Sequence, residues 1–187
     1  MSALFAWLDR VATPRRVVVL LVVELLALGC ENLLVFPLSV PYIRRLTGHA
    51  YLDLCAFCSA DQIYMHLDAF GAIGRKLQLL LLSTVDIVIP TVSGSFGALG
   101  IALLTRSRRE SRPELRWLIL VPISAAILDF TENGLIAVLT SCYPERMERV
   151  ATIAGLITGV KTIAYLATAS ILAVLALRRR EPSVTQA

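Results

Sequence analysis

The sequence predicts an all-α, polytopic membrane protein: a bundle of four transmembrane helices with a short amphipathic helix in the first outer loop. Of the 187 residues, 57% are hydrophobic and the mean hydropathy is +0.73, which is too apolar for an ordinary soluble domain. Charged residues make up 17% and gather between four long apolar runs. Runs of roughly 20 apolar residues cross a bilayer as helices, which satisfy their own backbone hydrogen bonds. We therefore expect one membrane domain over residues 1–187.

The four expected spans follow in order along the chain. Thr13 is a good N-cap and Pro14 suits the first helical position, so the first span should follow them and cover about residues 17–38. The remaining spans are expected at about 77–105, 117–140 and 150–177.

The distribution of cations predicts the orientation. Four spans place both termini on one side, which carries eleven cations, and the other side carries six. By the positive-inside rule, both termini are expected in the cytoplasm, with the bacterial inner membrane as the location. The cations also lie at the ends of apolar runs, so a nucleic-acid partner is not expected. No cleaved signal peptide is expected, because the first residues lack a basic start.

The first outer loop, residues 39–76, is the largest extramembrane segment expected. Ser59 and Gln62 have the spacing of a capping box, and apolar residues follow at helical spacing before Gly71. We expect an amphipathic helix over residues 60–70, lying on the outer membrane surface. A lid that packs on the bundle and a substrate gate are both open interpretations of this helix.

Ionisable residues inside the expected spans are the main functional signal. Each costs about 2.5–3.5 kcal/mol or more at the bilayer centre, so such residues need interior partners or a water-filled cavity. Counted at about 1.5 Å per residue, five of them fall in one layer of the outer half of the membrane, with Glu24 two turns below Glu31 on the same helix face. Tyr165 lies one turn from the lysine. The layer is predicted to form one site from Glu31, Asp86, Asp129, Glu132 and Lys161.

Two patterns near this layer have structural interpretations as well. Glu31-Asn32 in the first span resembles Glu132-Asn133 in the third, which could record a duplicated two-helix unit. Pro90, one turn after Asp86, should kink the second span and free a carbonyl. Gly155-x-x-x-Gly159 in the fourth span predicts close backbone approach within a compact bundle.

The cysteines permit a redox interpretation, although structural or incidental cysteines are favoured. Cys55 and Cys58 form a C-x-x-C in the outer loop, and Cys142 lies on the same side. The plan resembles the bacterial disulfide-forming quinone reductases, but that family keeps a cysteine pair where this chain has only Cys142. The two histidines, His49 and His66, complete no standard zinc pattern, so neither a metal nor a cofactor is expected.

Several runs resemble a group of small bacterial four-helix membrane proteins with a D-x-x-E-N motif in the third helix. They are Cys58-Ser-Ala-Asp-Gln-Ile-Tyr64, Gly71-Ala-Ile-Gly-Arg75, Asp86 with Pro90, and Asp129-Phe-Thr-Glu-Asn133. The resemblance covers about residues 31–165. It implies the topology and the choice of site residues, and it implies no activity.

The favoured hypothesis is a membrane enzyme that performs acid–base chemistry on a lipid-soluble substrate such as an isoprenoid or polyketide. The reaction would be isomerisation, cyclisation or epoxide opening, with Asp129 or Glu132 as the acid and Asp86 or Glu31 as the base. The expected substrate-binding residues are Glu24, Asn32, Asn133, Lys161 and Tyr165.

Three other functions remain open. The first is a non-catalytic lipid or ligand binder, or an assembly protein, with a structural polar network. The second is thiol–disulfide exchange by Cys55 and Cys58, and the last is transport. Membrane lipids and a hydrophobic small molecule are the expected partners, and a homodimer is left open.

Overall fold

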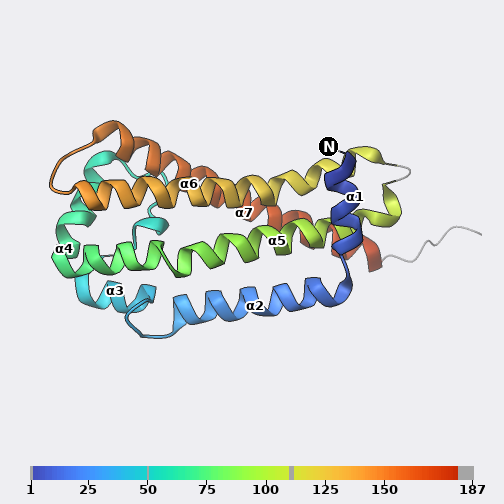
Figure 1. The fold of residues 1–187 in the computed structure, drawn as a ribbon, viewed down its shortest axis with the longest axis horizontal. Helices are drawn as coiled ribbons and strands as arrows, with labels where there is room; N and C mark the ends of the chain where they lie inside the picture. The colour runs from blue at the N-terminus through green and yellow to red at the C-terminus, as the bar shows by residue number, and fades with distance from the viewer. Residues whose placement is uncertain (1, 50, 110–111, 181–187) are drawn as a thin grey trace, which may run out of the picture.

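The computed structural model describes residues 2–49, 51–109 and 112–180 (Figure 1). This part of the chain contains helices and loops and no strand, as the sequence predicts. The α-helices are α1 (Ser2–Val11), α2 (Pro14–Leu33), α3 (Val40–Thr47), α4 (Ala60–Leu82), α5 (Val85–Thr105), α6 (Leu120–Cys142) and α7 (Glu148–Arg180). Short 3-10 helices are η1 (Leu52–Leu54), η2 (Arg106–Arg108) and η3 (Pro113–Ile119).

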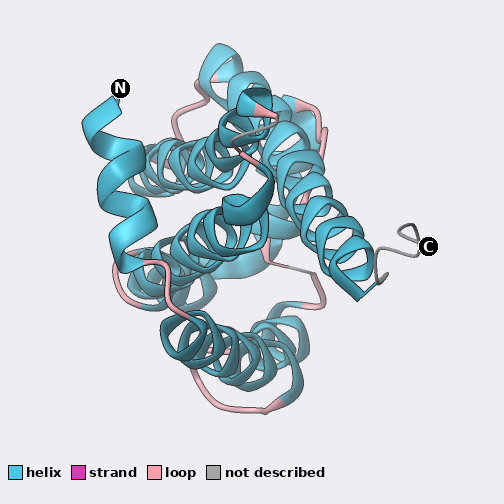
Figure 2. Ribbon diagram, turned by 90° about the vertical axis from the view of Figure 1, so that its right-hand side faces the viewer, coloured by secondary structure: helices cyan, strands magenta, loops and turns pink. Residues whose placement is uncertain are grey.

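Three helical segments within the described residues are long and apolar enough to cross a membrane: Ala60–Arg108, Pro113–Cys142 and Glu148–Arg178. They make the chain a helical membrane protein. Helix α2 has 20 residues but carries Arg15, Arg16, Glu24 and Glu31, and it is not among the three. It lies alongside α5 in the elongated bundle (Figures 1 and 2).

The start of α2 agrees with the sequence, and its end does not. Thr13 caps the helix by accepting a hydrogen bond from the backbone N–H of Arg16 at 3.4 Å, and Pro14 lies in the first turn. The helix ends at Leu33 instead of residue 38, because Leu34 takes an extended backbone conformation shortly before Pro37.

The expectation of one helix over residues 77–105 is wrong. Helix α4 ends at Leu82 and α5 begins at Val85, with Ser83 and Thr84 between them. The hydroxyls of both residues donate to the carbonyl of Leu80, at 3.0 Å and 2.6 Å, and Thr84 leaves the helical region of φ and ψ. Hydroxyl side chains that bond to the backbone in this way compete with helix propagation. Asp86 therefore lies in the first turn of α5 and not in the middle of a long helix.

The third and fourth spans match their predicted bounds closely. Helix α6 starts at Leu120, after η3, and ends at Cys142, against an expected 117–140. Helix α7 covers Glu148–Arg180, against an expected 150–177.

The capping box that starts α4 is confirmed. The Ser59 side chain accepts from the N–H of Gln62 at 3.3 Å, and the Gln62 side chain accepts from the N–H of Ser59 at 2.8 Å. Gly71, with a φ of 59°, interrupts the helix where an end was predicted, but α4 resumes and continues to Leu82.

The sequence analysis expected the first half of α4 to lie on the membrane surface, but its apolar face packs into the bundle. Its apolar face, with Ile63, Leu67 and Phe70, is buried in a cluster that includes Ile136 of α6 and Ala151 of α7. Packing inside the bundle removes this apolar face from water, which is favourable. The outer segment therefore covers one end of the bundle.

The opposite end of the bundle is covered by α1, a helix that the sequence analysis did not predict (Figure 1). Phe5 and Leu8 are buried against Ile101 of α5, and the ring of Phe5 packs edge-on against Trp117 at 5.7 Å between centroids. The buried charged residues lie toward the other end of the bundle, near η1 and α4.

Candidate functional site

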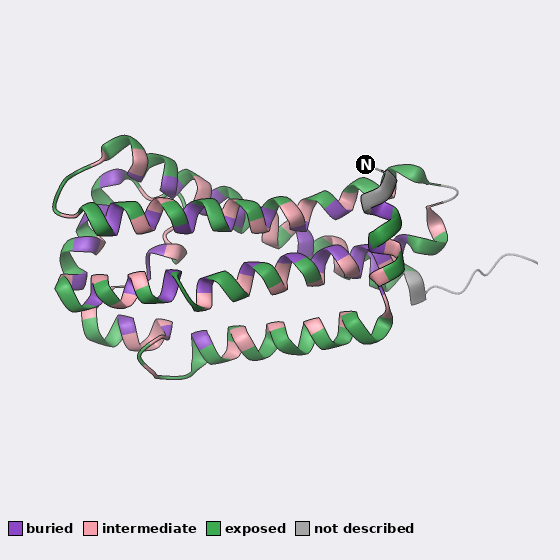
Figure 3. Ribbon diagram, viewed as in Figure 1, coloured by how far each residue is buried: buried purple, intermediate pink, exposed green. Residues whose placement is uncertain are grey.

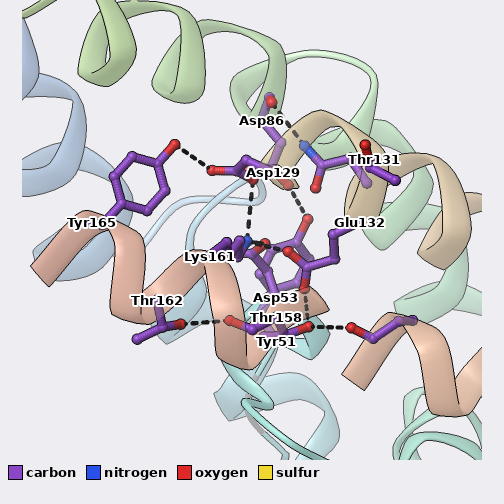
Figure 4. Close-up of polar contacts among 12 residues, drawn as sticks. Tyr51, Asp53, Asp86, Asp129, Thr131, Glu132, Thr158, Lys161, Thr162 and Tyr165 are labelled. Carbon is purple, nitrogen blue, oxygen red and sulfur yellow. Dashed lines mark hydrogen bonds and ion pairs between the residues drawn. The ribbon is translucent and has the colours of Figure 1, made fainter. Parts of the chain in front are cut away.

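Lys161 of α7 is the centre of the buried charged layer (Figure 4). Its ammonium group donates to Asp129 at 3.1 Å and also contacts the carboxylates of Asp53 and Glu132. The ammonium therefore forms two hydrogen bonds and one further ion pair with carboxylates, and Lys161 is held as a cation among three acidic side chains.

Asp129 of α6 is supported on both carboxylate oxygens. Its Oδ1 accepts from Lys161, and its Oδ2 accepts from the Tyr165 hydroxyl at 2.8 Å. Lys161 and Tyr165 are one turn apart on α7, so the close packing of α6 on α7 aligns both donors with the same carboxylate.

Asp86 of α5 has different partners. The hydroxyl of Tyr51, which precedes η1, donates to its carboxylate. The backbone carbonyl of Asp86 is the one that Pro90, four residues later, leaves without a helical N–H donor. Asn133 Nδ2 donates to this carbonyl at 3.0 Å. The freed carbonyl predicted from Pro90 is present, and a side chain from α6 satisfies it.

A cavity of about 400 Å³ connects these groups. It lies among α2, α5 and α7, with one residue each from α3 and α6 and three from the segment around η1. One part of its wall is apolar and includes Ile89, Pro90, Phe96 and Leu172. The polar part of the wall is formed by Glu24, Glu31, Asn32, Tyr51, Asp53, Asp86, Ser93, Asp129, Lys161, Thr162, Tyr165 and Thr168.

The cavity reaches the outside of the bundle between α2 and α7. Leu28 of α2 and Leu166 of α7 line it, yet they are 38% and 64% exposed. The outward faces of these helices are mainly exposed and apolar, and α2 shows this along most of its length (Figure 3). An apolar molecule can reach the cavity through this side of the bundle.

The structure brings seven of the nine predicted site residues to this cavity. They are Glu24, Glu31, Asn32, Asp86, Asp129, Lys161 and Tyr165. The other two, Glu132 and Asn133, do not line it. Glu132 is fully buried behind Lys161, where it also accepts from the Thr158 hydroxyl, and Asn133 holds the carbonyl of Asp86. Both residues position their neighbours.

Sequence reasoning missed Tyr51 and Asp53. Both line the cavity, and they supply the donor to Asp86 and a carboxylate to Lys161. The sequence analysis considered only ionisable residues within expected spans, whereas these two precede the C-x-x-C motif in the outer loop. The C-x-x-C motif is the sequence signal that could have pointed to Tyr51 and Asp53, because its disulfide constrains the loop in which both residues lie.

Cys55 and Cys58 form a disulfide with a Cα–Cα distance of 5.5 Å, and the loop between them docks on α7. The backbone N–H of Phe57 donates to the carbonyl of Gly155 at 2.9 Å. A Cβ atom at Gly155 would lie 2.0 Å from the Cys58 carbonyl oxygen, and one at Gly159 would lie 2.3 Å from the Phe57 ring. The close backbone approach predicted at Gly155-x-x-x-Gly159 is present, and the segment that approaches is this loop.

Tyr51 keeps its proton at neutral pH. Burial, and then the negative charge of Asp86, raise the pKa of this phenol well above its ordinary value. The hydroxyl can therefore serve as a hydrogen-bond donor to Asp86 throughout the physiological range.

Three carboxylates have a spacing that would suit a metal ion, since oxygen atoms of Asp53, Asp129 and Glu132 lie within 4.8 Å of one another. The same three side chains contact the Lys161 ammonium. The Lys161 ammonium lies among these carboxylates, in the position that a metal ion would take, so the arrangement holds a lysine there and does not fit a metal centre.

Comparisons of the chain with protein-family models, with curated proteins and with solved structures found no match.

Proposed function

We propose that the chain crosses a bacterial inner membrane four times, with α2 as the first span and both termini in the cytoplasm. Helix α2 has 20 residues, which corresponds to about 30 Å of helix. Its two acidic residues, Glu24 and Glu31, line the cavity, while Leu25 and Leu26 on its outward side are exposed. Arg15 and Arg16 lie at one end, where their side chains can extend to the membrane surface.

Within this membrane domain, we propose acid–base catalysis on a lipid-soluble substrate such as an isoprenoid or a polyketide. The observation that carries the proposal is that Asp86 and Asp129 line one cavity with different supporting groups. Asp129 shares the Lys161 ammonium, which favours the ionised carboxylate. The contact that the described residues make to the Asp86 carboxylate is the neutral Tyr51 hydroxyl.

These different partners suggest separate roles for the two carboxyl groups. Asp129 is the base and Asp86 is the acid, because a pair with distinct environments can hold one proton in a defined place. This reverses the assignment expected from the sequence. Glu31 provides a further carboxyl group on the opposite wall, and Glu132 fixes Lys161 from behind.

Isomerisation, cyclisation and epoxide opening all fit such a pair, because each needs a proton delivered to one atom and removed from another or from water. The apolar wall near Pro90, Phe96 and Leu172 suits the body of the substrate, and the opening between Leu28 and Leu166 admits it from the bilayer. Excluding water there strengthens each electrostatic contact with the reacting atoms.

The test uses purified protein in nanodiscs, incubated with the apolar extract of membranes in which the protein occurs. Products are compared by mass spectrometry for the parent, Asp86→Asn, Asp129→Asn and the control Glu145→Gln, which removes an exposed carboxyl group outside the cavity. We expect conversion of a lipid-soluble compound by the parent and control only. Equal conversion by both aspartate variants would refute the acid–base role.

A further inference from the structure

The cavity has no free positive charge to offer a ligand. Among the described residues that line it, Lys161 is the only basic side chain, and its ammonium is already hydrogen-bonded to Asp53 and Asp129 and ion-paired with Glu132. A phosphate or carboxylate head group placed there would meet carboxylates without a compensating cation. The lining therefore disfavours anionic lipids.

Two carboxyl groups on α2 remain poorly satisfied and line the cavity. Glu31 is only 8% exposed, and the hydrogen bond found for its carboxylate is from the adjacent Asn32 amide at 3.5 Å. Glu24 accepts from the Ser93 hydroxyl through Oε1 at 2.6 Å, while its Oε2 is buried without a partner in the described part of the chain. A buried carboxylate oxygen without a hydrogen-bond donor is energetically unfavourable. The α2 wall of the cavity therefore needs a hydrogen-bond donor.

The two groups lie on one face of α2, two turns apart. The apolar wall formed by Pro90, Phe96 and Leu172 belongs to the same cavity. An elongated ligand can therefore place a polar group against α2 while its apolar body contacts α5 and α7.

We propose that the ligand of this cavity is a lipophilic amine, whose protonated nitrogen pairs with one of the two α2 carboxylates, Glu31 or Glu24, while the other adds to the negative charge of this wall. This inference rests on the proposed function and names the substrate class of the same site. An ammonium supplies both the missing hydrogen-bond donors and the missing positive charge, and it does so in a water-poor cavity where charge-assisted hydrogen bonds are strong.

The test compares three probes that differ only in the head group: decylamine, decanol and decanoate. Binding to the full chain in nanodiscs of neutral phosphatidylcholine is measured at pH 8, where an alkylamine is protonated, and binding to empty nanodiscs is subtracted. We expect the amine to bind at least about tenfold more tightly than the alcohol, as a charge-assisted hydrogen bond implies. Decanoate should bind most weakly.

Glu31→Gln and Glu24→Gln keep the side-chain shape, so each should reduce the preference for the amine over the alcohol. Glu145→Gln, which changes a carboxyl group outside the cavity, should leave it unchanged. Decanol or decanoate binding as tightly as the amine would overturn the inference while leaving the cavity as a ligand site. If a folded protein binds none of the three probes, this inference is wrong, and the conversion assay with the aspartate variants decides the proposed function separately.

Discussion

Asn133 Nδ2 donates to the backbone carbonyl of Asp86 at 3.0 Å, and this is the carbonyl that Pro90 deprives of a helical donor. The hydrogen bond ties α6 to α5 at the turn that carries the proposed acid. A proline that would be costly in an ordinary helix is thereby accommodated by a side chain from the neighbouring span.

The first prediction concerns this contact. Asn133→Leu should lower the free energy of unfolding by about 1–3 kcal/mol, because a buried carbonyl loses its donor. Adding Pro90→Ala should recover part of the loss, since an alanine at this position restores a backbone N–H. Unfolding in detergent measures the double-mutant cycle, with the exposed Glu145→Gln, outside the cavity, as the control. Strictly additive effects would show that the two residues are not coupled.

The second prediction concerns Lys161. Lys161→Met removes the cation that three carboxylates share, so we expect a loss of about 3–5 kcal/mol in stability, as for a broken buried ion pair. Combining Lys161→Met with Glu132→Gln should be less harmful than the sum of the separate changes, because one unpaired charge is removed as well. Thermal unfolding checks both variants. A Lys161→Met protein as stable as the parent would contradict the central position of the ammonium.

The third prediction separates a structural disulfide from a redox one. Gly155→Ala should displace the Cys55–Cys58 loop, because a Cβ atom would lie 2.0 Å from the Cys58 carbonyl oxygen. We expect faster amide exchange across residues 51–58 and reduced substrate conversion, with the disulfide intact. Gly134→Ala is the control, since nothing lies within 4 Å of a Cβ atom there. If Gly155→Ala behaves like the parent while Cys55→Ser is inactive, the thiol–disulfide hypothesis is favoured instead.

The fourth prediction concerns pH and Tyr51. Its pKa is raised in the folded state by burial and by Asp86. Unfolded tyrosine titrates near pH ~10, so the unfolded state releases this proton first and stability falls as the pH rises above that value. The parent should lose stability between about pH 9 and 11 more steeply than Tyr51→Phe. Parallel pH profiles for the two proteins would contradict the buried hydrogen bond to Asp86.

Much of the fold follows from the sequence because membrane helices have strong local signals. Apolar run length located α6 and α7, and Thr13 and Ser59 identified the starts of α2 and α4. Counting the rise per residue correctly placed Asp86, Asp129 and Lys161 together, since residues at one depth of a small bundle have few places to lie.

The remaining features depend on contacts that local patterns do not encode. Asp53 reaches Lys161 across 108 positions of sequence, and it does so from a loop whose path is set by the disulfide and by Gly155. The break at Ser83 and Thr84 depends on hydroxyl groups whose choice between backbone and other partners is decided by tertiary packing. These two cases explain the missed site residues and the wrongly joined helix.

Transfer of a proton to the substrate is the central claim, and it can be measured without knowing the substrate in advance. The parent protein, Asp86→Asn, Asp129→Asn and Glu145→Gln are each incubated with the apolar membrane extract in D2O, and carbon-bound deuterium is then detected by mass spectrometry after back-exchange in H2O. Where the proton goes to carbon, the account predicts a lipid-soluble compound that gains non-exchangeable deuterium with the parent and Glu145→Gln; where it goes to an epoxide oxygen, the same spectra show a new product without that label. Either aspartate variant should give neither. A folded parent that neither labels nor converts any compound, or labelling and conversion that both aspartate substitutions leave unchanged, would contradict the account.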